Sequence, residues 1–198
     1  MNIMVVLAHP VRASLTGALG EGARETLAAL GHAVQFHHLD AEGFDPRIGA
    51  EELAARRSAD PLVERHCAEL AAADGIVIVH PNWWSQPPAN LKGWIDRVVR
   101  PGVAYDFAKD DAGKSVPVGL LKARTAVVLN TANVPQAVEQ SLVGDPLEAL
   151  WAKVVFDRCG VKDVRRRVFA VAATASPEQR AAWVEEARAL VRDAFPAG

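Results

Sequence analysis

The run Gly75-Ile76-Val77-Ile78-Val79 constrains the fold of this chain more than any other feature. It is short, rich in β-branched residues and apolar on both of its alternating faces. That pattern is typical of a strand in a parallel sheet with helices on both sides. The chain leaves this strand at Pro81, and Pro87 and Pro88 precede a helical pattern over residues 89–99. The loop between them therefore lies at the carboxyl end of a strand, where open α/β sheets bind ligands.

Four further strands alternate with helical patterns along the chain. Ser14 is a plausible N-cap for the first helix, and Gly31 is suited to end it. Residues 40–60 are expected to form a surface connection with a partial helix, and residues 103–121 an irregular loop. The strands are expected at residues 3–8, 33–39, 125–131 and 163–173, and the other helices at residues 61–73, at 145–156 and from Ser176 onward.

Alternating strands and helices imply right-handed crossovers and parallel pairing. We therefore predict one flavodoxin-like domain over residues 1–198, with a doubly wound five-stranded parallel sheet in the order 2-1-3-4-5. Its crevice lies between strands one and three. A TIM barrel needs more strand-helix units. A dinucleotide-binding Rossmann fold normally has a glycine fingerprint after the first strand, and residues 8–14 contain no glycine.

Composition excludes several classes of function. The formal net charge is -2, so no overall positive field attracts nucleic acid. The two cysteines, Cys67 and Cys159, have neither disulfide nor zinc-site spacing. The sequence opens on a strand-length apolar run instead of a signal peptide, and its apolar stretches are too short to span a bilayer. We expect a soluble, cytoplasmic protein.

The loops after strands one, three and four supply the candidate site residues. His9, Ser14 and Thr16 lie where a helix N-terminus suits a phosphate, although Ser14 serving only as a cap is about equally plausible. Trp83 and Trp84 favour a flat ligand, with burial in the core as the alternative. Asn130, Thr131 and Asn133 offer hydrogen bonds to a polar heterocycle, although asparagine is also common in turns.

Other chemistries have little support in the sequence. His37 and His38 are consecutive on a strand and so point to opposite faces, and His66 has no partner at ligand spacing, so no metal site is predicted. The G-x-S-x-G turn of a serine hydrolase is absent. A helix N-terminus that can bind a phosphate, close to aromatic loops, is typical of an enzyme in which a bound cofactor supplies the chemistry. Flavin is the cofactor that fits a flavodoxin-like site.

Several segments together resemble the flavodoxin-like NAD(P)H:quinone oxidoreductase family. They are residues 8–10 with Ser14-Leu15, residues 40–46, residues 80–94 and residues 102–105. The resemblance implies a homodimer with flavin at the subunit interface, and hydride transfer from NAD(P)H through flavin to a quinone by a ping-pong route. By resemblance, His9, Ser14, Leu15 and Thr16 match the flavin phosphate loop, and Pro81, Asn82, Trp83, Trp84 and Ser85 match the loop along the flavin ring. Residues Asn130, Thr131, Ala132 and Asn133 match the third flavin loop, and Tyr105 and Trp84 match the acceptor pocket as candidate catalytic residues.

The chain departs from the family in its third flavin loop, in the segment that follows it, and at Thr16, where asparagine is frequent. Many members have Thr-Thr-Gly-Gly where this chain has Asn130-Thr131-Ala132-Asn133, so side chains replace two glycines near the flavin. The Tyr and His that assist hydride transfer in animal members have no counterparts in residues 134–144. The chain also ends soon after its last helix, as bacterial members do, which favours FMN over FAD.

Two other functions stay open at this stage. Some bacterial members are ancillary subunits of potassium efflux transporters, so docking on a membrane transporter with incidental reductase activity is the alternative. A one-electron carrier is disfavoured because such carriers are strongly acidic, and this chain is not. The sequence distinguishes neither NADH from NADPH nor one acceptor from another.

Overall fold

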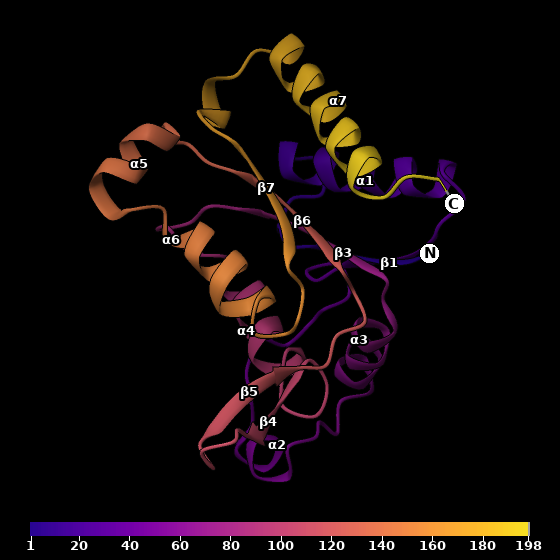
Figure 1. The fold of residues 1–198 in the computed structure, drawn as a ribbon. Coiled ribbons are helices and arrows are strands. Elements are labelled where there is room, and N and C mark those ends of the chain that lie inside the picture. Colours follow the sequence, from indigo (N-terminus) through magenta and orange to yellow (C-terminus); the bar gives the residue numbers. More distant parts are fainter. Residues whose placement is uncertain (198) are drawn as a thin grey trace.

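The computed structural model describes residues 1–197 and is built on a five-stranded sheet in the order β2-β1-β3-β6-β7 (Figure 1). The strands are β1 (Asn2–Leu7), β2 (Ala33–His38), β3 (Gly75–Pro81), β6 (Thr125–Thr131) and β7 (Asp163–Phe169). Every neighbouring pair is parallel. The predicted flavodoxin-like order, counted over these five strands, is therefore confirmed.

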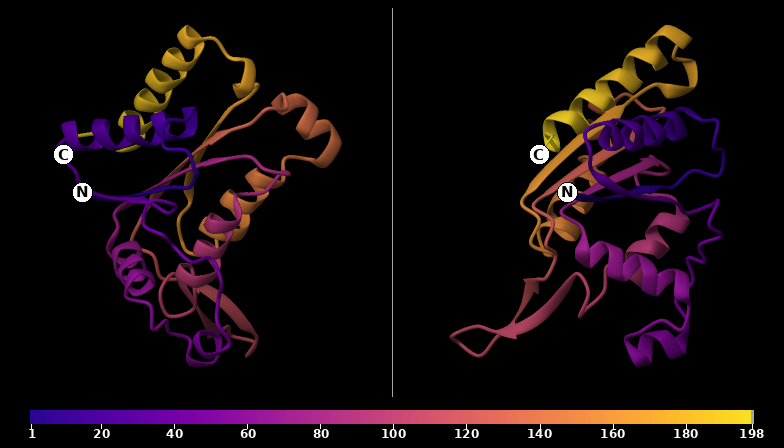
Figure 2. Two further views of the ribbon diagram at one scale, coloured as in Figure 1. Left: turned by 180° about the vertical axis from the view of Figure 1, so that it is seen from behind. Right: turned by 90° about the vertical axis from the view of Figure 1, so that its right-hand side faces the viewer.

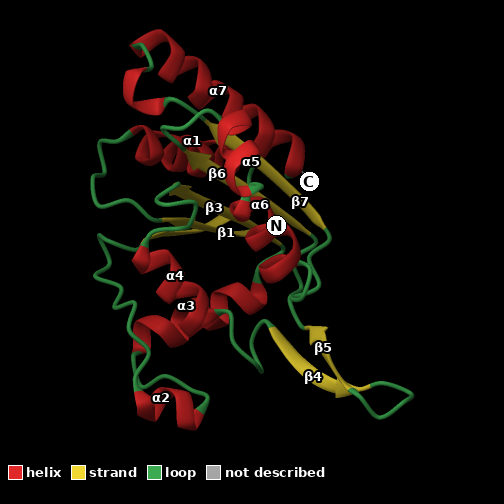
Figure 3. Ribbon diagram, turned by 90° about the vertical axis from the view of Figure 1, so that its left-hand side faces the viewer, coloured by secondary structure: helices red, strands yellow, loops and turns green. Residues whose placement is uncertain are grey.

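Helices cover both faces of the sheet, as the doubly apolar strands require (Figure 3). One face carries α1 (Leu15–Ala29) and α7 (Pro177–Ala194), and the other carries α3 (Pro61–Ala72), α4 (Ala89–Val98) and the π-helix η1 (Ala149–Phe156). Alternate residues of β3 pack into the two hydrophobic cores, one on each face of the sheet. Val77 and Val79 pack toward α1 and α7, whereas Ile76 and Ile78 pack toward α3 and α4.

The local signals act as the sequence predicts. The Ser14 hydroxyl accepts a hydrogen bond from the Gly17 N–H at 3.0 Å and caps α1. Gly31 ends that helix with φ +82°, a left-handed conformation that glycine adopts without steric cost. Ser176 caps α7 with Pro177 at its first position. Within residues 40–60, the short helix α2 (Ala50–Ala55) forms the expected partial helix.

The prediction of an irregular loop at residues 103–121 is wrong. This segment contains an antiparallel hairpin of β4 (Tyr105–Lys109) and β5 (Ser115–Gly119), which projects from the body of the molecule (Figure 2). Tyr105 and Phe107 alternate along β4, and the Asp110 carboxylate accepts from the N–H groups of Ala112 and Lys114 at the tip. The alternating pattern was present in the sequence, but glycine and charged residues in the turn concealed it.

The fifth strand is shorter than predicted. It pairs with β6 as far as the Thr131 and Phe169 register, and beyond that the Ala172 N–H donates to the Ala132 carbonyl at 2.9 Å. Val171 then has φ +60°, and the chain turns into the 3₁₀ helix η2 (Ala172–Thr174). The helix predicted from Asp145 is divided into α6 (Pro146–Glu148) and η1, and α5 (Gln136–Val143) precedes them. No helix in residues 1–197 is both long and apolar enough to cross a membrane.

Candidate functional site

Loops from three strands meet at the carboxyl edge of the sheet. Thr16, at the start of α1, lies 2.9 Å from Thr131 between their hydroxyl oxygens. The Asn82 N–H, just after β3, donates to the Thr131 carbonyl at 2.6 Å. The rings of His9 and Trp83 lie 6.2 Å apart between centroids. The structure therefore brings the three predicted loops together at one edge.

The first loop presents the N-terminus of α1. Leu15 and Thr16 occupy its first two positions, where backbone N–H groups lack partners within the helix, and the helix dipole favours an anion there. Gly17 allows the loop to fold closely onto the helix, because a Cβ atom at this position would lie 2.0 Å from the Arg12 carbonyl oxygen. Ser14 caps the helix and also lies beside the backbone N–H groups of Leu15 and Thr16. Its two proposed roles are therefore compatible.

The second loop is a tight turn that exposes both tryptophans. Trp83 and Gln86 close it through mutual backbone hydrogen bonds of 3.0 and 3.1 Å. Trp84 and Ser85 both have left-handed backbones, with φ of 55° and 58°, which costs about 1–3 kcal/mol for each residue. Trp84 is 98% exposed and Trp83 is 46% exposed, so the alternative of burial in the core is wrong. The strained turn presents a flat apolar surface beside the α1 N-terminus.

The third loop uses most of its polar groups for hydrogen bonds within the protein. Asn130 is fully buried, and its Oδ1 accepts from the Arg166 Nε at 2.9 Å. The Asn133 Oδ1 accepts from the Ala173 N–H at 3.0 Å, so this side chain is bonded to η2. Ala132 is buried and hydrogen-bonded through its backbone to Phe169 and Ala172. The Oδ1 atoms of both asparagines are therefore bonded within the protein, whereas the buried Asn130 Nδ2 has no partner in the described residues.

Glu139 is a residue of this edge that sequence reasoning missed. The Asn82 Nδ2 donates to its two carboxylate oxygens at 2.9 and 2.7 Å, and Glu139 is only 8% exposed. A carboxylate only accepts hydrogen bonds, so this contact fixes the orientation of the Asn82 amide. The one available signal was a glutamate in the segment that follows the fourth strand.

His80 holds the start of the second loop through buried hydrogen bonds. It is completely buried, its Nε2 accepts from the Trp151 indole N–H at 3.0 Å, and its Nδ1 donates to the Pro81 carbonyl at 2.9 Å. Because indole is only a donor, this arrangement fixes one neutral tautomer. Burial lowers the pKa of His80 to about 4. His80 therefore holds the Pro81 backbone in place as a neutral group.

Tyr105 lies apart from the other candidate residues of the same chain. It begins β4, and its ring meets that of Phe107 edge-on at 5.7 Å. It lines a separate cleft with residues of α2, α4 and η1. None of the other candidate site residues lines that cleft.

His37, Glu42 and His66 lie together, although sequence spacing gave His66 no partner. The His37 Nδ1 is 3.1 Å from the Glu42 Oε1, and the His66 Nε2 is 3.4 Å from the Glu42 Oε2. The group has the composition of a metal site. However, the Trp94 indole N–H donates to the His66 Nδ1 at 3.0 Å, so neutral His66 carries its proton on Nε2, facing Glu42. That proton occupies the lone pair which a metal would need.

Burial raises the pKa of Glu42, but hydrogen bonds from His37 and His66 prevail and lower it to about 2. The His37 Nε2 also meets the Glu69 carboxylate at 2.5 Å. The cluster therefore acts as a set of charge-assisted hydrogen bonds that join β2 to α3.

Comparisons with known proteins agree with this geometry. Residues 1–194 match the family model described as "Flavodoxin-like fold". An uncharacterized NAD(P)H oxidoreductase of Haemophilus influenzae is 31% identical over 93% of this chain and 91% of its own length. An FMN-dependent NADH:quinone oxidoreductase of Ralstonia nicotianae is 32% identical over 81% of this chain and 70% of its own.

Not every match spans a whole relative. A ribosyldihydronicotinamide dehydrogenase-like protein of Penicillium crustosum is matched over 57% of its own length. Among solved structures, an NAD(P)H:quinone oxidoreductase from Methanothermobacter marburgensis superimposes with a TM-score of 0.80 at 24% identity, covering 98% of this chain and 95% of that one. At this identity the superposition establishes the fold.

Proposed function

The chain belongs to the flavodoxin-like fold family, and from this premise we propose that it is a flavin-dependent NAD(P)H:quinone oxidoreductase. The match to the family model and to the Haemophilus relative confirms the family resemblance that the sequence predicted. The observation that carries the proposal is the meeting of a helix N-terminus, an exposed indole turn and a third backbone loop at one sheet edge. The Ralstonia relative is named as FMN-dependent, which favours FMN over FAD.

The residues present fit a flavin mononucleotide. The N–H groups of Leu15 and Thr16, beside the Ser14 hydroxyl and His9, would hold the phosphate. The turn that follows Pro81 and Asn82 would support the ring, with backbone groups near Trp83 and Ser85 as donors and acceptors. In the third loop, the backbone from Asn133 onward would contribute, since both backbone groups of Ala132 are bonded to Phe169 and Ala172 and the Asn133 side chain is bonded to η2.

When bound, flavin supplies two-electron hydride chemistry between NAD(P)H and a quinone in alternating half-reactions. The chain itself has to orient the reactants and exclude water. Trp84, which is exposed on its strained turn, would cover a flat substrate. Glu139 would keep the Asn82 amide fixed beside the ring-binding loop.

A homodimer gives Tyr105 a place in this mechanism. Its cleft contains none of the flavin-loop residues of the same chain, so an acceptor-pocket role requires Tyr105 to act at the partner's site. We include this interface, and a cytoplasmic location, in the proposal. No contact within residues 1–197 bears on docking to a potassium efflux transporter.

Anaerobic titration tests the proposal. Purified protein reconstituted with FMN or FAD should bind one of them, bleach on addition of NADH or NADPH, and recover its colour with a quinone. The preferred flavin and nicotinamide follow from the same titration. Protein that binds neither flavin would overturn the proposed function.

A further inference from the structure

Glu139 and Asp145 are the acidic residues that are buried within residues 1–197, and they differ in their partners. Asp145 is 7% exposed and pairs with the Arg166 guanidinium at 2.8 Å. Glu139 is 8% exposed and forms no ion pair in the described part of the chain, because its two oxygens accept only from the Asn82 amide. Burying a carboxylate without a cation is costly. The burial of Glu139 therefore calls for a reason other than stability.

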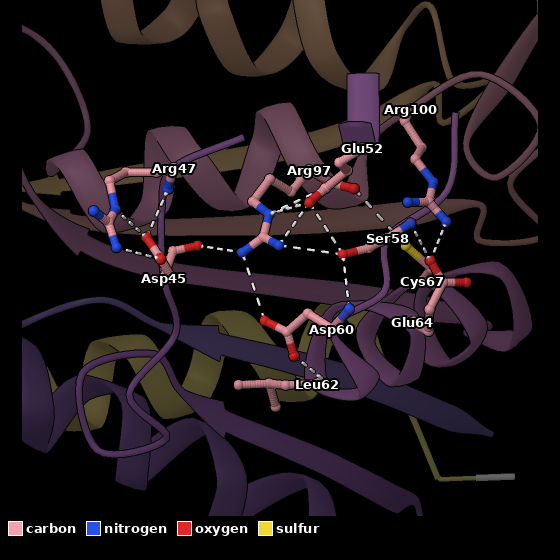
Figure 4. A network of polar contacts seen from close by, with 10 residues as sticks. All are labelled: Asp45, Arg47, Glu52, Ser58, Asp60, Leu62, Glu64, Cys67, Arg97 and Arg100. Carbon is pink, nitrogen blue, oxygen red and sulfur yellow. Dashed lines mark hydrogen bonds and ion pairs between the residues drawn. The ribbon is translucent and has the colours of Figure 1, made fainter. Parts of the chain in front are cut away.

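The acidic side chains of the network between α2, α3 and α4 each have an arginine partner (Figure 4). The Glu52 side chain, which is 11% exposed, pairs with Arg97 at 2.7 Å, and Glu64 pairs with Arg100 at 2.6 Å. Glu139 therefore departs from the way in which this chain neutralises other weakly exposed acids.

Apolar packing does not account for the burial of Glu139. It is the only residue of α5 that is buried. Val138 and Leu142 of the same helix are 44% and 75% exposed. The helix therefore turns a glutamate toward the body of the molecule, and the hydrogen bonds of that glutamate to Asn82 join α5 to the loop after β3.

Glu139 lies between two loops of the candidate site. Asn82 directly precedes Trp83 in the second loop, and its N–H donates to the carbonyl of Thr131 in the third loop. α5 begins at Gln136, soon after that third loop. The Asn82 Oδ1 is buried without a partner and would face the carboxylate if the amide turned over, so the charge of Glu139 also fixes this amide. An unpaired negative charge is thus held at the edge where we place the flavin.

The consequence of this charge rests on the proposed function, in which a hydride passes from NAD(P)H to flavin. A hydride carries two electrons and one proton, so its transfer leaves NAD(P)⁺ and adds one negative charge to the flavin site. Transfer of the hydride onward to a quinone, with a proton from water, removes that charge again. A second negative charge, buried nearby and weakly screened by salt, disfavours the reduced state.

We propose that Glu139 lowers the reduction potential of the flavin bound at this edge, through a charge that no cation neutralises. The flavin is then harder for the nicotinamide to reduce and a stronger donor to its acceptor, which suits acceptors of low reduction potential. Two unit charges about 10 Å apart, at an effective dielectric constant of about 20, change an equilibrium constant by about tenfold. For a two-electron couple this corresponds to about 30 mV.

The reduction potential of the FMN-reconstituted protein tests the proposal. Anaerobic equilibration with a reference dye measures it without turnover. Glu139→Gln and Glu139→Ala both remove the charge, so each should raise the potential by about 30 mV, a tenfold change in the equilibrium constant. Glu139→Asp keeps the charge, and its equilibrium constant should stay within about twofold of wild type.

Asp193→Asn is the matched control. The Asp193 carboxylate is 80% exposed and pairs at 2.6 Å with Arg165, near the amino end of β7 and away from the site. Loss of the same charge there should leave the potential unchanged. Thermodynamic linkage supplies a second measurement, because the two uncharged variants at position 139 should also favour reduced over oxidised FMN in binding by about tenfold more than wild type does.

The outcomes separate this inference from the proposed function. Wild-type potentials in both uncharged variants, with normal FMN binding, would overturn the inference alone. An equal rise of the potential in Glu139→Asp would also overturn it, since the effect would then come from the geometry of α5 and not from charge. A protein that binds flavin in none of these forms would overturn the proposed function and this inference with it.

Discussion

Gly17→Ala is the sharpest test of the first loop. The new Cβ atom would lie 2.0 Å from the Arg12 carbonyl oxygen and 3.0 Å from its carbon. Since both are backbone atoms, no side chain can turn aside, and the loop has to move by more than about 1 Å to restore ordinary contact. Overpacking of this kind costs about 1–3 kcal/mol, against a gain of about 0.5–1 kcal/mol from replacing glycine within a helix. We expect a net loss of about 1–2 kcal/mol.

Two measurements follow that loss. At a slope of about 2 kcal/mol/M, the urea midpoint should fall by about 0.5–1 M. The dissociation constant for FMN should rise about tenfold or more, because displacement of the loop weakens charge-assisted hydrogen bonds to the phosphate. Flavin fluorescence quenching reports this directly.

Gly20→Ala provides the control within the same helix. Its Cβ atom would meet only the Leu7 methyl groups, at 3.3 Å, and a flexible side chain can adjust to that contact. This variant should stay within about 0.5 kcal/mol of wild type and bind FMN normally. A Gly17→Ala protein with unchanged stability and unchanged FMN affinity would refute the reasoning about the loop.

Three further tests address other parts of the molecule. Trp84→Ala should leave the free energy of unfolding within about 0.5 kcal/mol, because the side chain is 98% exposed, but lower kcat/KM for the quinone about tenfold; an unchanged kcat/KM would exclude this indole from the acceptor site. Glu42→Gln should remove a pH dependence. The pKa of Glu42 is lowered from its usual 4.5 to about 2, so its contribution to stability is present above pH 4.5 and lost as the pH falls toward 2. Urea midpoints measured across that window should fall more steeply for the wild type than for the variant, and parallel curves would contradict the assignment. Trp151→Phe leaves the buried His80 Nε2 without its donor and should cost about 1–3 kcal/mol, whereas Trp183→Phe, which removes no indole hydrogen bond within residues 1–197, is the control and should cost less.

Strand order was predictable because β1, β3 and β6 are apolar runs and each crossover has a single preferred hand, although β7 carries three consecutive arginines. The Ser14 cap and Gly31 were predictable for a similar reason, since both act within one turn of helix. The β4–β5 hairpin was missed because its alternating residues are mostly exposed and only weakly apolar. Length gave no help there, because an irregular functional loop and a hairpin occupy the same number of residues.

The site was less predictable than the fold, since its details depend on contacts between distant segments. Nothing local indicates that Asn133 bonds to Ala173 or that Asn82 bonds to Glu139. The His37, Glu42 and His66 cluster likewise forms only when β2 and α3 are packed together. Tyr105 could be assigned an aromatic role from its neighbours in sequence, but its position away from the flavin loops of its own chain required the structure.

The position of β1 between β2 and β3 has a consequence for synthesis on the ribosome. β1 pairs with both β2 and β3, so three of the five strands are complete once residue 81 has been made. The loop that carries His9 lies within this segment and the loop that carries Trp83 follows it directly, whereas β6 and β7 come after the hairpin. Since chains are made from the amino terminus at about 5–20 residues per second, these two loops exist seconds before the third one. We therefore expect the nascent chain to form two of the three loops of the candidate site early. The last two strands, β6 and β7, then add the third loop.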